Sequence, residues 1–144
     1  MELVKELRAL SEGVESTVTV LPNACALIFY SVEDLNWAGF YILNNGILQL
    51  GPFQGRPACV AIGLGKGVCG TAAREERTVL VENVHEFPGH IACDCASNSE
   101  IVVPIYKNGA LWGVLDIDSP LIGRFGREEK ELFEAFAAAI GEYI

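Results

Sequence analysis

The chain has 144 residues, the usual size of one domain, and is long enough to bury a core without disulfides or metals. It carries 10 basic and 19 acidic side chains, a formal net charge of −9, and 51% of its residues are hydrophobic. This hydrophobic content excludes a disordered chain, and the acidic balance argues against nucleic acid or an anionic membrane as a partner. No apolar run approaches the roughly 20 residues of a membrane-spanning helix, and the N-terminus lacks the pattern of a signal peptide. We therefore expect a single cytoplasmic domain over residues 1–144.

Apolar spacing predicts helices first, then strands, and a helix at the end. Pro22 lies within an apolar stripe near the N-terminus, where it should either kink the helix or begin a new one. Asn-Gly pairs at 45–46 and 108–109 are typical of tight hairpin turns. In chain order, the expected elements are helices at 3–14 and 18–30, strands at 37–43, 47–50 and 58–62, a short helix at 68–74, strands at 78–81, 100–106 and 111–118, and a helix at 132–143.

Because most of these strands are joined by hairpins, we expect a largely antiparallel six-stranded sheet. The N- and C-terminal helices should pack on one face of it, which makes an α+β fold. The long loop at 83–99 is the first place to look for a site, since loops of this length in small domains usually carry function.

The register of the second hairpin decides where its acidic residues lie. A two-residue loop at 108–109 would pair Ile101 with Asp116, an apolar side chain against an acid. A three-residue loop with a bulge pairs Ile101 with Leu115 and Glu100 with Asp116, so we favour it. The carboxylates expected to gather on one side of the sheet are those of Glu100, Asp116 and Asp118.

Carboxylates this close cannot all ionise freely, because like charges raise the pKa of at least one of them. A protonated member could donate a proton, and ionised members could hold an ammonium group. The alternative is a solvated acidic end of a hairpin. Trp37 and Tyr41 lie on one face of the first strand, where they either wall an apolar pocket or belong to the core.

Five cysteines, an odd number, argue against a structural disulfide framework in a reducing compartment. The segment from His90 to Cys95 could contribute to a metal site, although its spacing matches no zinc motif. Cys69 lies in the first turn of a predicted helix, whose dipole would lower the pKa of its thiol, and Cys93 follows His90 in the long loop. Local chemistry does not choose between these two thiols as a nucleophile. The cysteines are Cys25, Cys59, Cys69, Cys93 and Cys95.

Six segments together resemble the free methionine-(R)-sulfoxide reductases, a branch of the GAF-domain fold. A generic GAF domain would share the layout of these segments but not their cysteines. In order, the segments are 36–41 (NWAGFY), 51–55 (GPFQG), 65–73 (GKGVCGTAA), 87–94 (FPGHIACD), 97–102 (SNSEIV) and 113–120 (GVLDIDSP).

The resemblance implies that free methionine (R)-sulfoxide is reduced to methionine without a metal or organic cofactor. Cys93 matches the attacking thiolate, and Cys59 and Cys69 match the cysteines that form disulfides afterwards. Thioredoxin is the implied reductant. Cys95 departs from the family pattern, which leaves the disulfide pairing open.

The resemblance also assigns roles around the substrate. The three acids at 100, 116 and 118 match residues that hold the substrate amino group and assist protonation of the sulfoxide oxygen. Trp37 and Tyr41 match an aromatic wall around the substrate methyl group.

Exposed terminal helices make a homodimer plausible. The competing interpretations are a GAF module that senses a small ligand and a redox sensor without turnover.

Overall fold

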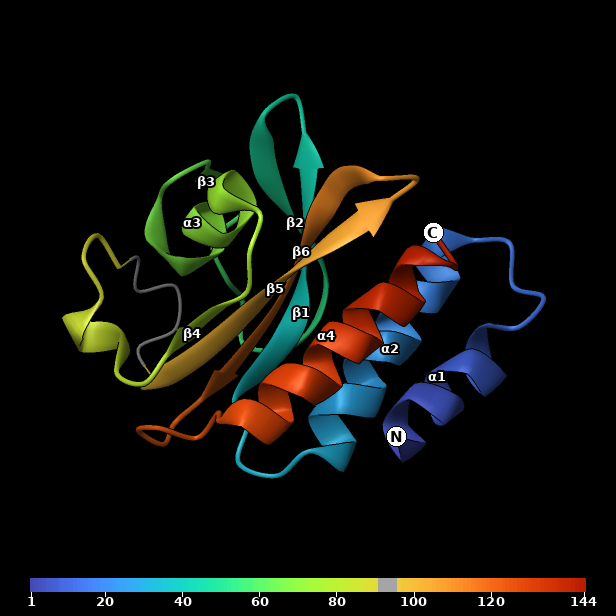
Figure 1. Cartoon of the computed structure of the whole chain (residues 1–144), viewed down its shortest axis with the longest axis horizontal. Helices are drawn as coiled ribbons and strands as arrows, with labels where there is room; N and C mark the ends of the chain where they lie inside the picture. The colour runs from blue at the N-terminus through green and yellow to red at the C-terminus, as the bar shows by residue number, and fades with distance from the viewer. Residues whose placement is uncertain (91–95) are drawn as a thin grey trace.

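A computed structural model describes residues 1–90 and 96–144 of the chain. In this part, a six-stranded sheet is covered on one face by α2 and α4, with α1 packed against these two helices, and on the other face by α3 (Figure 1). The elements are α1 (Glu2–Ser11), α2 (Thr17–Ser31), β1 (Trp37–Asn44), β2 (Ile47–Gly55), β3 (Ala61–Gly63), α3 (Gly67–Glu75), β4 (Val79–Val81), the 3₁₀ turn η1 (Val84–Glu86), β5 (Ser99–Lys107), β6 (Ala110–Ser119) and α4 (Arg127–Gly141).

The strand order is β3-β2-β1-β6-β5-β4, and every neighbouring pair is antiparallel. This confirms the predicted α+β architecture with terminal helices on one face. No helix in the described ranges is both long and apolar enough to cross a membrane.

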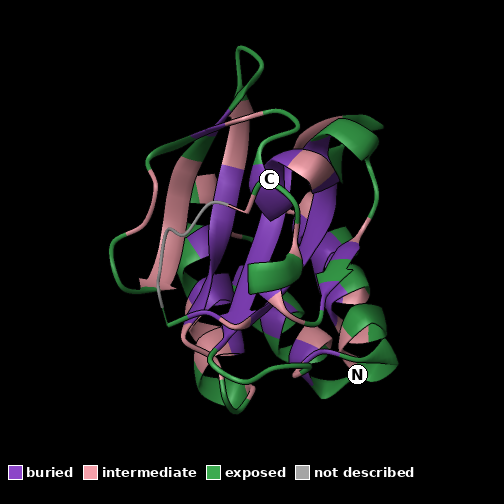
Figure 2. Cartoon of the chain, turned by 90° about the vertical axis from the view of Figure 1, so that its left-hand side faces the viewer, coloured by how far each residue is buried: buried purple, intermediate pink, exposed green. Residues whose placement is uncertain are grey.

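Alternation along the strands divides the core into two layers, and the central strands are buried along most of their length (Figure 2). In β1, Ala38 and Phe40 belong to the layer under α2 and α4, whereas Trp37 and Tyr41 belong to the layer under α3. Successive side chains of a strand point to opposite faces, so one strand serves both layers. The layer under α3 is where polar groups also enter the interior.

The turn between β5 and β6 differs from the prediction. Asn108 and Gly109 form a two-residue loop, both with positive φ (52° and 81°), which matches the turn type that suits the twist of a hairpin. The register then shifts between Ile105 and Tyr106, leaving Trp112 as an extra residue in β6. The predicted three-residue loop was wrong because the additional residue lies inside the strand, as a β-bulge.

The bulge restores apolar pairing beyond it. Ile101 lies opposite Ile117, not Leu115, and Glu100 lies opposite Asp118, not Asp116. The predicted pairs were therefore wrong by two residues. The predicted gathering of carboxylates on one face nevertheless holds, since the two-residue period is kept.

Pro22 does not begin a helix, because α2 starts at Thr17 and runs continuously through the proline. Proline removes the hydrogen bond to the carbonyl four residues earlier. That residue is Val18, which is 77% exposed in the first turn of α2.

Candidate active site

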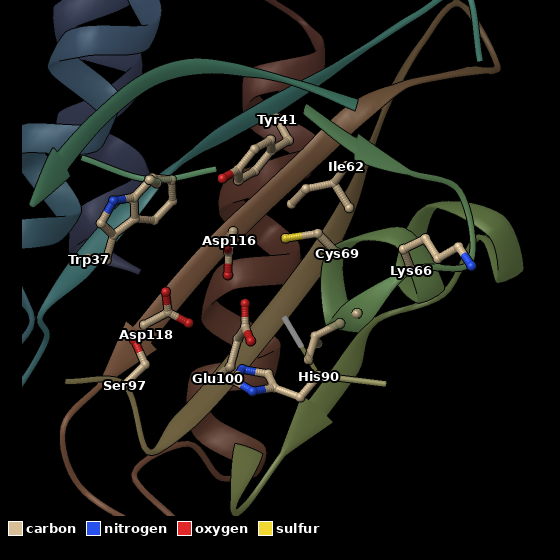
Figure 3. A pocket seen from close by; sticks show the side chains of 13 residues that line it. Trp37, Tyr41, Ile62, Lys66, Cys69, His90, Ser97, Glu100, Asp116 and Asp118 are labelled. Atoms are coloured by element: carbon tan, nitrogen blue, oxygen red, sulfur yellow. The ribbon is translucent and has the colours of Figure 1, made fainter. Parts of the chain in front are cut away.

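A pocket opens on the α3 side of the sheet, between the strands and the N-terminal end of α3 (Figure 3). All three acids and both aromatic residues expected at the site line it, together with one cysteine. The lining residues are Trp37, Tyr41, Ala58, Ile62, Lys66, Gly67, Val68, Cys69, His90, Ser97, Glu100, Asp116 and Asp118.

The hairpin of β5 and β6 places the three carboxyl groups in the pocket. Glu100 lies directly opposite Asp118, and Asp116 follows on the same face of β6. All three side chains are buried, with exposures of 7%, 5% and 8% for Glu100, Asp116 and Asp118. Their neighbours on the opposite face, Ile101 and Ile117, belong to the main core, which prevents the strands from rotating the acids into water.

Burial dominates the electrostatics of this cluster. It raises the pKa of Glu100 well above its usual value, and the charges of Asp116 and Asp118 raise it further. Burial also raises the pKa of Asp116, although hydrogen bonds from Glu100 and Cys69 partly offset this. Neither Glu100 nor Asp116 forms an ion pair with a described residue. The site therefore concentrates acidic groups that a bound cation would stabilise.

Cys69 is the third residue of α3, in the first turn as predicted. The helix approaches the sheet closely at the next position, where a Cβ on Gly70 would lie 2.4 Å from the carbonyl oxygen of Gly63. Cys69 is 4% exposed, and burial, followed by the charges of Asp116 and Glu100, raises the pKa of its thiol well above normal. The predicted effect of the helix dipole is thus outweighed, and Cys69 is a neutral thiol at pH 7.

Trp37 and Tyr41 form a stacked pair, with ring centroids 6.0 Å apart and planes inclined by 24°. Each also holds the segment that joins β2 to β3. The indole Nε1 of Trp37 donates to the carbonyl of Arg56 at 3.0 Å, and the Tyr41 hydroxyl donates to the carbonyl of Cys59 at 2.8 Å. The aromatic wall therefore fixes the position of the segment that carries Cys59.

The three described cysteines lie in different environments. Cys59 is half-buried and disulfide-bonded, whereas Cys25 and Cys69 are free thiols. Cys25 is a residue of α2 that faces the main core, away from the pocket, and it donates to the carbonyl of Pro52 at 3.1 Å. The predicted nucleophile Cys93 and the unexpected Cys95 lie outside the described residues.

Three polar residues of the pocket were not predicted as site residues. Lys66 immediately precedes α3, and Ser97 accepts a hydrogen bond from the Asn36 side chain at 3.0 Å. His90 was considered as a metal ligand in the segment 90–95, of which it alone is described, and as a protonated neighbour that would lower the pKa of Cys93. Burial and the charge of His85 lower the pKa of His90, so its ring is neutral at pH 7. The only signal in the sequence that could have placed His90 in the pocket was its position beside a loop glycine.

The profile of the GAF domain family matches residues 3–144. With its six-stranded antiparallel sheet and a pocket under α3, the chain belongs to the GAF domain family.

Within that family its relatives include free methionine-R-sulfoxide reductases, as the sequence segments predicted. The chain is 49% identical to the free methionine-R-sulfoxide reductase of Escherichia coli (strain K12), over 99% of this chain and 87% of that protein. It is 44% identical to the protein of the same name from Saccharomyces cerevisiae, over 98% of this chain and 83% of that protein. The structure of the fRMsr of Staphylococcus aureus in complex with its substrate is similar with a TM-score of 0.94 and 48% identity, covering 99% and 93% of the two chains.

Proposed function

We propose that this protein reduces free methionine (R)-sulfoxide to methionine. The observation that carries the proposal is the buried cluster of Glu100, Asp116 and Asp118 beside an aromatic wall. Free methionine sulfoxide carries an ammonium group, which three buried carboxyl groups would bind, and a methyl group, which suits Trp37 and Tyr41. A methionine sulfoxide inside a protein has an amide in place of the ammonium group, so the same cluster would reject it.

The proposed chemistry begins at Cys93, by resemblance to the family. Its thiolate attacks the sulfoxide sulfur while an acid of the cluster protonates the sulfoxide oxygen. As the sulfur–oxygen bond breaks, methionine leaves and Cys93 keeps the oxygen as a sulfenic acid. The raised pKa of Glu100 supports its role as the proton donor, because it holds a proton at a pH where an ordinary glutamate has lost it.

Cys59 is the proposed resolving cysteine. Its thiol condenses with the sulfenic acid, which forms a disulfide and releases water, and a dithiol such as that of thioredoxin then reduces the disulfide by exchange. The disulfide-bonded state of Cys59 supports this role, whereas Cys69 is a free buried thiol. A thiol cycle of this kind requires a reducing compartment, which fits the proposed cytoplasmic location.

The test is turnover driven by dithiothreitol on the separate R and S epimers of free methionine sulfoxide. A third substrate, N-acetylmethionine sulfoxide, has the same sulfoxide but no ammonium group. We expect turnover of the R epimer alone, with rates for the acetylated compound lower by about 100-fold or more, since a lost charge contact is worth about 3 kcal/mol.

A Cys93→Ser variant should abolish turnover, whereas the matched control Cys25→Ser should keep it because Cys25 lies in the other core layer. If Cys93→Ser retains activity, the attack belongs to a different thiol. If neither epimer is turned over but either one binds, the protein is a ligand-sensing GAF module.

A further inference from the structure

Cys69, Glu100 and Asp116 come together in an arrangement that suits a divalent metal ion. One possible ligand atom from each residue lies within 4.8 Å of the other two, and all three residues are buried. They come from α3, β5 and β6, so their backbones are fixed by three separate packed elements. Figure 3 shows the three side chains converging in the pocket.

A second observation points to a ligand at the same place. The Oδ1 atom of Asp116 has no hydrogen-bond partner among residues 1–90 and 96–144, and Asp116 is only 5% exposed. Buried polar atoms are almost always paired, so an unpaired carboxylate oxygen calls for a bound donor or cation.

The donor atoms define the class of metal. Magnesium and calcium take oxygen ligands, whereas a thiolate combined with carboxylates selects zinc or the softer cadmium. Zinc binds sulfur at about 2.3 Å and carboxylate oxygen at about 2.0–2.2 Å, so the ligand atoms would move inward by about 1 Å. Side-chain rotation supplies a shift of this size without moving the strands. Three protein ligands leave a fourth position for water or for Asp118, which lines the same pocket.

We propose that the protein binds one Zn²⁺ or Cd²⁺ ion at Cys69, Glu100 and Asp116, and that the ion excludes methionine sulfoxide from the pocket. The ion would act as an inhibitor and not as a cofactor, because it takes the carboxyl groups that the substrate ammonium needs. Metal binding is independent of the proposed reductase activity, and only the competition rests on it.

The test uses a variant with the substitutions Cys59→Ser, Cys93→Ser and Cys95→Ser, which leaves Cys25 and Cys69 as its thiols. This variant lacks the proposed nucleophile, so binding is measured without turnover. Titration with Cd²⁺ should produce the ultraviolet charge-transfer band of a cadmium–thiolate bond, saturating at a single equivalent. Circular dichroism establishes that each variant is folded.

Adding Cys69→Ser to this background should abolish the band, whereas the matched change Cys25→Ser should leave it intact. Asp116→Asn should keep the band but weaken cadmium binding by about tenfold or more, since even the partners of metal ligands contribute 10–100-fold. Absence of the band in the background variant, or its survival after Cys69→Ser, overturns the proposal.

The same background variant separates the competition from the metal site. Saturating methionine sulfoxide should raise the apparent dissociation constant for Cd²⁺ at least tenfold. Unchanged cadmium affinity, while calorimetry detects bound methionine sulfoxide, would refute the shared pocket. Unchanged affinity with no sulfoxide bound would contradict the proposed substrate instead, and the cadmium band alone would then decide the metal site.

Discussion

Replacing Glu100 with glutamine should stabilise the fold and weaken the substrate site at the same time. Glu100→Gln keeps the size of the side chain but removes its ability to ionise. A carboxylate oxygen of Glu100 lies within 4.8 Å of one of Asp116. At an effective dielectric constant of about 20, two unit charges at this separation repel by about 3 kcal/mol.

The magnitude is similar if Glu100 is protonated in the folded state. Folding at pH 7 then requires proton uptake by a group whose unfolded pKa is about 4.3, at about 1.4 kcal/mol per pH unit, or about 4 kcal/mol. Allowing for relaxation around the new amide, we expect the free energy of unfolding at pH 7 to rise by about 1–3 kcal/mol. The loss of the proposed proton donor should lower kcat/KM by about 100-fold or more.

Dependence on pH provides an independent check. The folded pKa of Glu100 is raised, so between the unfolded pKa and the folded pKa the native state binds more protons than the unfolded chain. The stability of the unaltered protein should therefore fall as pH rises through this window, and the fall should be shallower in Glu100→Gln.

The assays are urea denaturation of the reduced protein between pH 5 and pH 8, values that bracket the ordinary stability optimum, and steady-state kinetics with free methionine sulfoxide. Glu6→Gln is the matched control, because Glu6 is exposed on α1 and should change stability by less than about 0.5 kcal/mol. A Glu100→Gln variant that is no more stable than the unaltered protein, with the same pH slope and the same kcat/KM, would refute the reasoning.

Three further predictions concern packing around the site. Gly70→Ala should lower the free energy of unfolding by about 1–3 kcal/mol, measured in urea, because its new Cβ would lie 2.4 Å from the carbonyl oxygen of Gly63; an unchanged midpoint would show that α3 shifts freely. Trp37→Phe removes the hydrogen bond to the Arg56 carbonyl, and should destabilise the protein by about 1–3 kcal/mol and raise KM; a change in kcat alone would contradict a role in the substrate wall. Burial raises the pKa of Cys25 to about 12, so its thiol should resist iodoacetamide in the folded protein and react in urea, as mass spectrometry of the peptides would show; labelling of the native protein would contradict the burial.

The sequence was sufficient to predict the order of elements, because helical and strand periodicities differ clearly along this chain. It was not sufficient for the register of the second hairpin. The extra residue could sit in the turn at 108–109 or inside β6 with the same alternation of apolar and acidic residues. Only the bulge at Trp112 distinguishes these arrangements, and no local pattern marks it.

The chemistry of Cys69 shows a second limit of prediction from the sequence. Its place at the start of a helix was predictable, since Gly67 and the small residues after it favour a close turn. Its high pKa was not, because it comes from the sheet that buries it and from acids that are 31 and 47 residues further along the chain. The gathering of those acids was predictable from the period of two along β5 and β6, independently of their exact partners.

Because of the bulge at Trp112, the β5–β6 hairpin should tolerate a change of length in its turn but not in the part of β6 that carries the acids. Lengthening the turn at 108–109 leaves the strands beyond the bulge in place. The carboxyl groups of the pocket would therefore keep their positions. Removing a single residue between the bulge and Asp116, with the bulge kept, would instead turn every later side chain of β6 over, placing isoleucine in the pocket and carboxylates in the main core. The number of residues from Gly113 to Asp118 is therefore constrained, independently of which residues occupy these positions.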